Sequence, residues 1–297
     1  DVNNKTWTKI ASGVEKISVD SVDQSIYYYY NNGTDVYKLT SVWNPDTEAV
    51  QPSQVDGWYY IENAGNFLWL KDNPSAKCIL TRDIQIGTAE NPFTEPFPFY
   101  GTLKSIGSQK TIEAHIVTAS GNTGLFSENT GGNLVLDNIR LTGSITANGT
   151  ASGTYVGGFL GMASKNTVIS NCVNEAAVSG GEQTGGIVGR LFASGSISNC
   201  INKGAISSNK FNMKGVLGGI FGFTNCNVTD CGNLGSINDP LNEIAAGIGG
   251  WLGYGAKMER CYNLGNITGR YYTAGIVGKT GGGAAVTIKD CFNAGAV

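Results

Sequence analysis

Five aromatic side chains near the C-terminal end of the sequence are the residues best suited to hold a ligand. They are Trp251, Tyr254, Tyr262, Tyr271 and Tyr272, and Arg260 and Arg270 lie among them. Exposed aromatic rings offer flat surfaces to sugar rings or to a protein partner. The sequence therefore marks these five residues as a candidate ligand surface. Ordinary packing of loop residues against the body of the fold is the alternative.

Two aspartates could take part in glycoside hydrolysis, which needs two carboxyl groups about 5 to 10 Å apart. Asp230 and Asp290 occupy equivalent places two repeats apart, with Arg260 at the same place between them. We expect Arg260 to hold both acids ionised, which leaves neither as a proton donor. The pattern favours corner residues joined by a salt bridge over a catalytic pair, although the spacing keeps the pair open as an alternative.

The single histidine, His115, would have to serve any Ser-His-Asp site, and one histidine cannot build a histidine-rich metal site. No H-E-x-x-H and no C-x-x-C motif occurs in the sequence. We expect His115 to be a strand residue without catalytic duty. The sequence thus predicts no catalytic residue, no metal and no cofactor.

The composition limits the classes of partner. Charged residues make up 14% of the 297 residues and the formal net charge is −3, with no basic run. This argues against a nucleic-acid ligand. No stretch approaches the roughly 20 apolar residues that span a bilayer, so we expect no direct membrane insertion. The chain opens on Asp1 rather than Met, so we expect a mature or truncated product of a secreted protein.

Two short blocks alternate from residue 157 to the end of the chain. The first is small-Gly-apolar-x-Gly, in Gly157–Gly161, Gly185–Gly189, Gly218–Gly222, Ala246–Gly250 and Ala274–Gly278. The second centres on Cys172, Cys200, Cys231, Cys261 and Cys291. Copies of each block begin 28 to 33 residues apart, which indicates a repeat of about thirty residues.

The second block predicts a corner in the chain. An aliphatic residue stands three positions before each Cys, and side chains three apart on a strand face opposite sides. For both to face inward, the strand must break between them. The residue before Cys is Asn or Asp in four copies, and these types tolerate the left-handed conformation that such a corner needs. Arg260 departs from this pattern.

Stacked repeats would place equivalent residues in columns about 4.8 Å apart. The column of Asn174, Asn202, Asn233, Asn263 and Asn293 could then link amide to amide along the axis. The cysteine column would have parallel side chains, which is the wrong geometry for disulfides, so we expect buried free thiols. Cys226, five residues before Cys231, is the most plausible exception. Cys78 is expected to be an isolated buried thiol.

These short strands with bends between them predict an all-β chain folded as a parallel β-helix, or solenoid. The alternative is a β-propeller, but its blades need about 40 residues or more. The repeats here are shorter than that.

The GGIVG and GGIFG blocks, each followed by a C-x-N-x-G turn, resemble the GLUG-motif repeats of bacterial surface proteins and adhesins. The resemblance extends with lower specificity over about residues 57–297. It implies a right-handed solenoid displayed outside a bacterial cell, and no particular ligand. The resembling repeats also occur beside metalloprotease domains.

The upstream part is less regular. Ile61 to Leu70 has helical spacing and predicts a short cap on the open end of the solenoid. We expect irregular first coils over 56–150 and regular repeats over 151–297, with Leu136 to Ile139 in the place of a Cys block. Residues 1–55 predict a small β segment with a turn at Asn31-Asn32-Gly33, followed by a linker over 41–56.

The function that the sequence favours is a non-enzymatic, adhesin-like protein outside a bacterial cell or on its surface. The solenoid would be a rigid spacer and a binding face for a glycan or a cell-surface protein. A carbohydrate-active enzyme with a groove along the helix is the rival, and a plain spacer without a ligand is the third possibility. Because Val297 falls on an apolar column position, we expect the protein to continue beyond it.

Overall fold

The computed structural model describes residues 5–11, 27–29, 36–41, 43, 45–149, 152–208, 215–240 and 243–297. The chain divides into two compact units, Asp1–Thr47 and Glu48–Val297. The smaller unit holds one antiparallel sheet in the order β1-β3-β2. Its strands are β1 (Lys5–Ala11), β2 (Tyr27–Tyr29) and β3 (Val36–Ser41). The turn expected at Asn31-Asn32-Gly33 lies outside the described residues.

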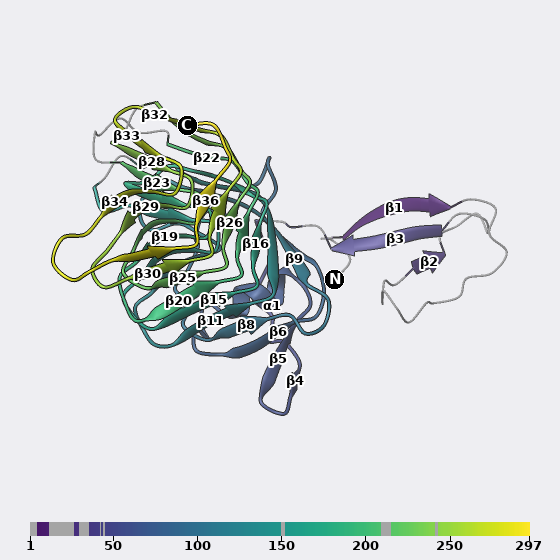
Figure 1. The fold of residues 1–297 in the computed structure, drawn as a ribbon. Coiled ribbons are helices and arrows are strands. Elements are labelled where there is room, and N and C mark those ends of the chain that lie inside the picture. Colours follow the sequence, from purple (N-terminus) through teal and green to yellow (C-terminus); the bar gives the residue numbers. More distant parts are fainter. Residues whose placement is uncertain are drawn as a thin grey trace. The chain divides into compact units, whose positions relative to one another are not determined.

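The larger unit is a parallel β-solenoid, as the repeats predict (Figure 1). Each regular coil passes in turn through a ten-stranded, a twelve-stranded, a five-stranded and a six-stranded sheet. Every strand pairs in parallel with its equivalents in the neighbouring coils, apart from the antiparallel hairpin of β4 and β5. The hairpin begins within the stretch 41–56 that we expected to be a linker.

The ten-stranded sheet holds β4 (Gln54–Val55), β5 (Trp58–Ile61), β6 (Lys77–Leu80), β8 (Thr102–Lys104), β11 (Leu134–Asp137), β15 (Thr167–Ser170), β20 (Gly195–Ser198), β25 (Asn227–Thr229), β30 (Lys257–Glu259) and β35 (Thr287–Lys289). The twelve-stranded sheet holds β7 (Ile84–Ile86), β9 (Lys110–Thr118), β12 (Ile139–Ala147), β16 (Val173–Asn174), β17 (Ala177–Ser179), β21 (Ile201–Asn202), β22 (Ile206–Ser207), β26 (Gly232–Asn233), β27 (Ile237–Asp239), β31 (Tyr262–Asn263), β32 (Ile267–Gly269) and β36 (Phe292–Asn293).

The five-stranded sheet holds β13 (Tyr155–Gly157), β18 (Gln183–Gly185), β23 (Val216–Gly218), β28 (Ile244–Ala246) and β33 (Tyr272–Ala274). The six-stranded sheet holds β10 (Phe126–Asn129), β14 (Leu160–Ala163), β19 (Val188–Leu191), β24 (Phe221–Thr224), β29 (Gly249–Leu252) and β34 (Val277–Thr280).

The predicted corner before each Cys is present in all five copies. The corner residues have φ between 51° and 57°, and Arg260, which departs from the Asn/Asp pattern, has a φ of 52°. The irregular coil before them has the same corner, because Asn138 has a φ of 58° and Leu136 pairs with Ile169. Ile139 therefore takes the place of a cysteine, as the sequence predicts.

The two repeated blocks of the sequence face each other across the core. The second residue of each glycine block lies opposite one Asn of the amide column. A Cβ atom added to Gly186 would lie 2.4 Å from Asn202 Cγ, and one added to Gly219 would lie 2.4 Å from Asn233 Cγ. No side chain fits there, so the glycine is required for the buried amide to reach its neighbours.

The helical cap forms as expected, as α1 (Ala64–Trp69). Asn63 caps it, because its side chain accepts a hydrogen bond of 2.9 Å from the Asn66 amide. Phe67 points into the first coils and is fully buried. Its ring stacks on Phe126 with centroids 5.5 Å apart and contacts Phe97 at 5.4 Å, so α1 covers apolar surface that the irregular first coils would otherwise expose.

Candidate ligand-binding surface

The structure distributes the five aromatic residues marked by the sequence over three sheets. Trp251 lies in β29 of the six-stranded sheet, Tyr262 in β31 of the twelve-stranded sheet and Tyr272 in β33 of the five-stranded sheet. Tyr254 follows β29 and Tyr271 precedes β33, and about half of each side chain is exposed. The five residues are close in sequence but do not share one sheet face.

Tyr262 forms a stacked pair with Phe292, its strand partner in the next coil. The ring centroids are 5.7 Å apart and the ring planes differ by 14°. The Tyr262 ring lies flat over Gly232, because a Cβ atom there would be 2.3 Å from the Tyr262 Cζ atom. This pair is a small aromatic surface on the twelve-stranded sheet.

Trp251 belongs to a larger row on the six-stranded sheet, which we call the aromatic strip. Strand pairing places one residue from each coil in the same register, and Glu128 of β10 precedes Met162 at the N-terminal end of the row. Two further residues flank the row. The aromatic strip consists of Met162, Arg190, Phe223, Trp251 and Lys279, flanked by Tyr155 and Phe192.

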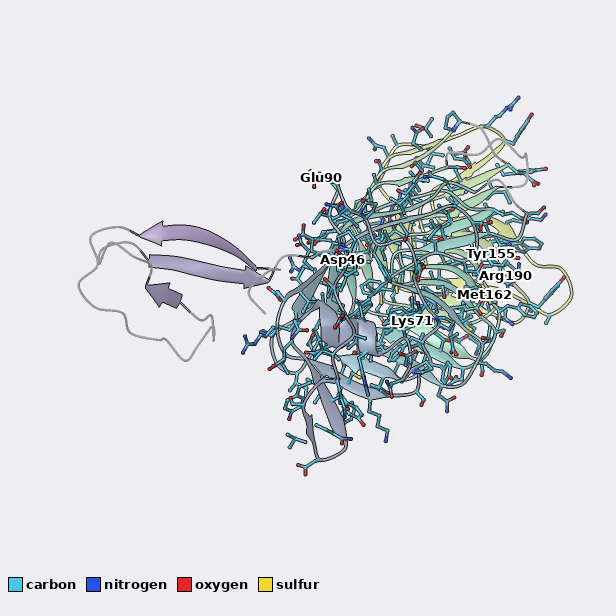
Figure 2. The ribbon with its side chains drawn as sticks, turned by 180° about the vertical axis from the view of Figure 1, so that it is seen from behind. Asp46, Lys71, Glu90, Tyr155, Met162 and Arg190 are labelled. Carbon is cyan, nitrogen blue, oxygen red and sulfur yellow. The ribbon has the colours of Figure 1, made fainter. Side chains whose placement is uncertain are left out.

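Arg190 is held among three aromatic rings. Its Cζ atom lies 5.1 Å from the ring centroid of Tyr155, 5.6 Å from that of Phe192 and 4.9 Å from that of Phe223. Figure 2 shows Arg190 beside Tyr155 and Met162. Its Nη1 also donates to Gln183 Oε1 at 3.3 Å. Cation–π contacts of this kind fix a guanidinium without neutralising its charge.

The other end of the strip repeats this arrangement with lysine. The Phe223 and Trp251 rings meet edge to face with centroids 5.4 Å apart, and Lys279 Nζ lies 4.6 Å from the Trp251 ring centroid. Trp251 Nε1 is buried and has no hydrogen-bond partner among the described residues. Over four successive coils, the strip thus holds a cation, two aromatic rings and a second cation, in that order.

Sequence reasoning missed Arg190, Phe223, Tyr155 and Phe192. A positional signal was present, because the row residue always follows directly after the last glycine of a glycine block. These following residues are Met162, Arg190, Phe223, Trp251 and Lys279. Their chemistry differs from coil to coil, so no repeated residue type marks the row.

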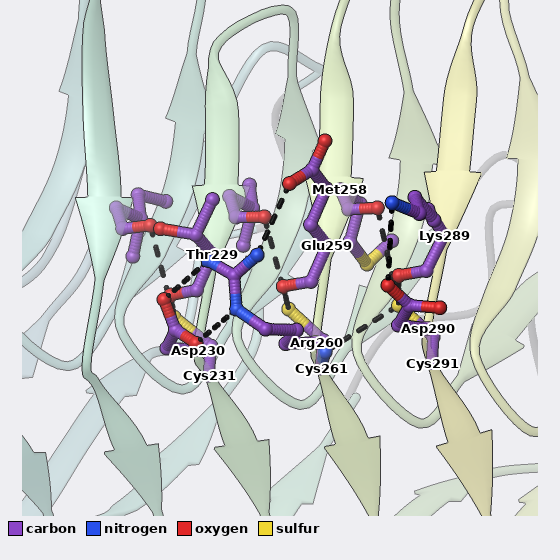
Figure 3. Close-up of polar contacts among 12 residues, drawn as sticks. Thr229, Asp230, Cys231, Met258, Glu259, Arg260, Cys261, Lys289, Asp290 and Cys291 are labelled. Carbon is purple, nitrogen blue, oxygen red and sulfur yellow. Dashed lines mark hydrogen bonds and ion pairs between the residues drawn. The ribbon is translucent and has the colours of Figure 1, made fainter.

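The corner residues Asp230, Arg260 and Asp290 differ from the expected arrangement (Figure 3). Arg260 makes a bidentate contact with Asp230, at 2.7 and 2.8 Å, and also binds Glu259 at 3.1 Å. It does not bridge Asp230 to Asp290, which instead pairs with Lys289 at 3.6 Å. The Arg260 hydrogen bonds lower the pKa of Asp230 below its ordinary value, so Asp230 is unsuited to donate a proton.

The cysteine column forms as predicted, and all seven cysteines are free thiols, Cys226 and Cys78 included. Each column thiol donates to the carbonyl oxygen two residues earlier, for example from Cys172 Sγ to Ser170 at 3.1 Å. Burial raises the pKa of Cys172 and Cys231, and it raises that of Cys78 to about 12, whereas, despite burial, hydrogen bonds from neighbouring column thiols lower the pKa of Cys200 and Cys261. The protonated, buried thiols of Cys172, Cys231 and Cys78 are poor nucleophiles.

His115 lies in a row of polar side chains on the twelve-stranded sheet. Its Nδ1 atom is 3.1 Å from Ser144 Oγ, and its Nε2 atom is 3.6 Å from Glu113 Oε1. Ser144 pairs with His115 across β12 and β9. In a Ser-His-Asp site the serine binds Nε2 and the acid binds Nδ1, so here the ring is reversed. The row is explained by cross-strand hydrogen bonding.

Among the described residues, no group of three or more His, Cys, Asp or Glu side chains is placed to hold a metal ion. None of the helices described is long and apolar enough to cross a membrane.

Comparisons with known proteins support the repeat and the fold. The model of the GLUG motif matches residues 180–207, which include one glycine block and one Cys block. No curated protein matches the chain. The fold is similar to that of a Bacteroides ovatus protein described provisionally as an immunoglobulin A1 protease, with a TM-score of 0.61 and 19% identity over 78% of this chain and 74% of that one.

A second solved structure, described as an IgA1 protease, has a TM-score of 0.55 and 16% identity. The match covers 90% of this chain but 23% of that protein, so this chain spans less than a quarter of its length. At these identities, the two likenesses show a shared β-solenoid fold.

Proposed function

We propose that this chain is a non-enzymatic, adhesin-like protein outside a bacterial cell or on its surface. Its solenoid serves as a rigid spacer, and the aromatic strip is its binding face for a glycan. The observation that carries this proposal is the register of the strip, which lines up Arg190, Phe223, Trp251 and Lys279 on one sheet. The exposed ring of Phe192 and the partly exposed ring of Trp251, with charged groups beside them, suit stacking on sugar rings.

Rigidity supports the role of spacer. Each coil is hydrogen-bonded to both neighbours, and the buried amide column joins successive coils at 2.6 to 2.8 Å. Solenoids of this kind are stabilised by contacts between adjacent repeats, so they form extended bodies with long faces. A ligand on such a face is presented at a fixed position.

The names of the similar structures raise a second candidate, a protease or a part of one. Only the likeness in fold supports this candidate. Among the described residues, the nearest approach to a nucleophilic site is Ser144 beside His115, and there the imidazole ring is reversed. The carbohydrate-active alternative needs a proton donor, and Arg260 keeps Asp230 ionised. Both observations favour the binding role.

The proposal is tested on a glycan array with the intact chain. The strip variant is the double substitution Phe192→Ala, Trp251→Ala, and its matched control is Tyr262→Ala on the twelve-stranded sheet. Binding that the strip variant loses and the control keeps supports the proposal. Loss in the control alone moves the ligand to the Tyr262–Phe292 pair and overturns the assignment to the strip. No glycan bound by the unchanged chain overturns the glycan role.

A second test addresses the enzyme alternative. A fluorophosphonate probe labels serine nucleophiles that a histidine activates. We expect Ser144 to remain unlabelled at neutral pH, with labelling followed by intact mass. Labelling of the chain that disappears in Ser144→Ala would contradict the non-enzymatic proposal.

A further inference from the structure

We propose that the ligand of the aromatic strip is an acidic polysaccharide that runs along the axis of the solenoid, with its carboxylate or sulfate groups at Arg190 and Lys279. This inference rests on the proposed function and names the chemistry of its ligand. Three features of the strip carry it: its direction, its uncompensated charge and the apolar rings between the charges.

The direction of the strip follows from strand pairing. Arg190, Phe223, Trp251 and Lys279 come from four successive coils and pair in register through β19, β24, β29 and β34. The row therefore runs across the strands, parallel to the solenoid axis, with a step of about 4.8 Å per coil. One sugar unit advances a polysaccharide by a comparable distance. A chain laid along the row would present successive units to successive side chains.

The charge of the strip is uncompensated. No ion pair is formed by Arg190 or Lys279 within the described residues, and the polar partner of Arg190 is the neutral Gln183 side chain. Some lysines on the solenoid, among them Lys104 and Lys257, likewise form no ion pair among the described residues, whereas six other cations are paired with acids. These pairs are Lys71–Glu95, Arg82–Glu62, Arg140–Glu175, Lys203–Glu175, Arg260–Asp230 and Lys289–Asp290.

Two cations held over rings without a counter-ion favour an anionic ligand. A guanidinium binds carboxylate and sulfate groups well, because its planar donors match their oxygen atoms. Gln183 fixes one edge of Arg190. A neutral polysaccharide would stack on the same rings but leave both charges unpaired.

The rings between the cations favour a ligand with apolar faces. Trp251, which is partly exposed, lies between Arg190 and Lys279 in the row, and Phe192 beside the row adds a ring that is 49% exposed. Phe223 is only 5% exposed and packs beneath Arg190, Phe192 and Trp251 as their support. Sugar rings present C–H faces that pack on aromatic rings. A single-stranded nucleic acid has both phosphates and stacking bases. The formal net charge of −3 opposes that ligand, and nucleic-acid binding is an outcome of the test.

The test compares polymers of matched length on the intact chain by calorimetry. The probes are oligogalacturonate, a sulfated chondroitin oligosaccharide, a neutral cello-oligosaccharide and single-stranded DNA. The variants are Arg190→Gln and Lys279→Gln. The matched control is Arg140→Gln, which removes one positive charge from an ion pair on the twelve-stranded sheet. Thermal melting confirms that each variant is folded.

We expect an acidic oligosaccharide to bind, with affinity that falls as salt rises. Arg190→Gln and Lys279→Gln should each weaken the affinity for the acidic oligosaccharide about tenfold, because each removes one charged hydrogen-bonding partner. Arg140→Gln should leave this affinity unchanged. Equal binding of the neutral oligosaccharide, unaffected by both strip variants, overturns this inference and leaves the proposed function standing. Binding of DNA alone overturns the inference and the glycan role. No binding of any probe overturns both as well.

Discussion

At the scale of single residues, the core of the regular coils contains an amide column that faces a glycine column. Each of the first four Asn residues of the column donates one hydrogen bond to the next Asn and one to the carbonyl oxygen two residues on, as Asn202 does to Asn233 and Gly204. The column begins at Asn174, because Leu141 stands at that position in the coil before. Buried amides with both donors paired stabilise the stack. Removal of one amide would leave buried polar atoms of the adjacent amides without hydrogen-bond partners.

Replacement of one central amide should therefore cost more than its own hydrogen bonds. We expect Asn233→Ala to lower the free energy of unfolding by about 3 kcal/mol, because Asn263 Oδ1 and the Gly235 carbonyl oxygen each lose the Asn233 donor. Urea unfolding measures the difference. The matched control is Asn293→Ala at the exposed end of the column, with a loss of about 1 kcal/mol. Equal losses at the two positions would contradict the cooperative column.

The Asp230–Arg260 contact predicts a pH dependence of the corner. The pKa of Asp230 is below its ordinary value of 3.8 in the folded chain, so its stabilising effect is complete at neutral pH. The effect fades as the pH falls below 3.8 and through the folded-state pKa. The substitution Asp230→Asn removes the charge and keeps a residue type that tolerates the left-handed backbone conformation of the corner. We expect the stability difference between the unchanged chain and Asp230→Asn to shrink as the pH falls through this range, in urea unfolding. A difference that stays constant would exclude the ion pair as its cause.

At the scale of elements, the strands are short, many with two to four residues, and none would be stable alone. Stacking supplies the stability, and stacking is also what the sequence predicts well. The period, the corners and both columns could be found because the same residue types recur at the same place in each coil. The aromatic strip could not, since its row changes from Met162 to Arg190, Phe223 and beyond. Grouping by sequence distance joined Trp251 to Tyr262 instead, although bends place them on different sheets.

The helical cap makes a prediction at this scale. Phe67 of α1 is fully buried between Phe97 and Phe126, whereas Trp69 at the end of the helix is partly exposed. We expect Phe67→Ala to lower the free energy of unfolding by about 4 kcal/mol, through lost burial and the cavity left behind. Trp69→Ala serves as the control and should cost clearly less. Chemical unfolding compares the two variants. Similar losses would show that α1 does not act through its buried face.

At the scale of the whole molecule, the solenoid separates an interior of apolar and amide columns from varied outer faces. Inside, the Asn column repeats one residue type, while other buried columns vary among apolar types, as in Leu160, Val188 and Phe221. Outside, the same register carries Met162 in one coil and Lys279 in another, since no packing requirement fixes the type. Ion pairs neutralise several surface cations, while the aromatic strip keeps two cations without acidic partners among the described residues. The interior maintains the shape, and the variable row is where a specific ligand face could arise.

The thiol column gives a test of the intact stack. Six of the seven cysteines are buried, and Cys291 in the last coil is partly exposed. A thiol reagent such as Ellman's can reach a buried column only when several coils separate, and burial also raises the pKa of Cys172 and Cys231. We expect one thiol to react quickly in the native chain, and this fast reaction should be absent from Cys291→Ser. The other six thiols should react at the rate of global unfolding. Urea should make all seven react at once. Fast reaction of Cys200 or Cys231 in the native chain, located by mass spectrometry, would mean that the central coils open on their own.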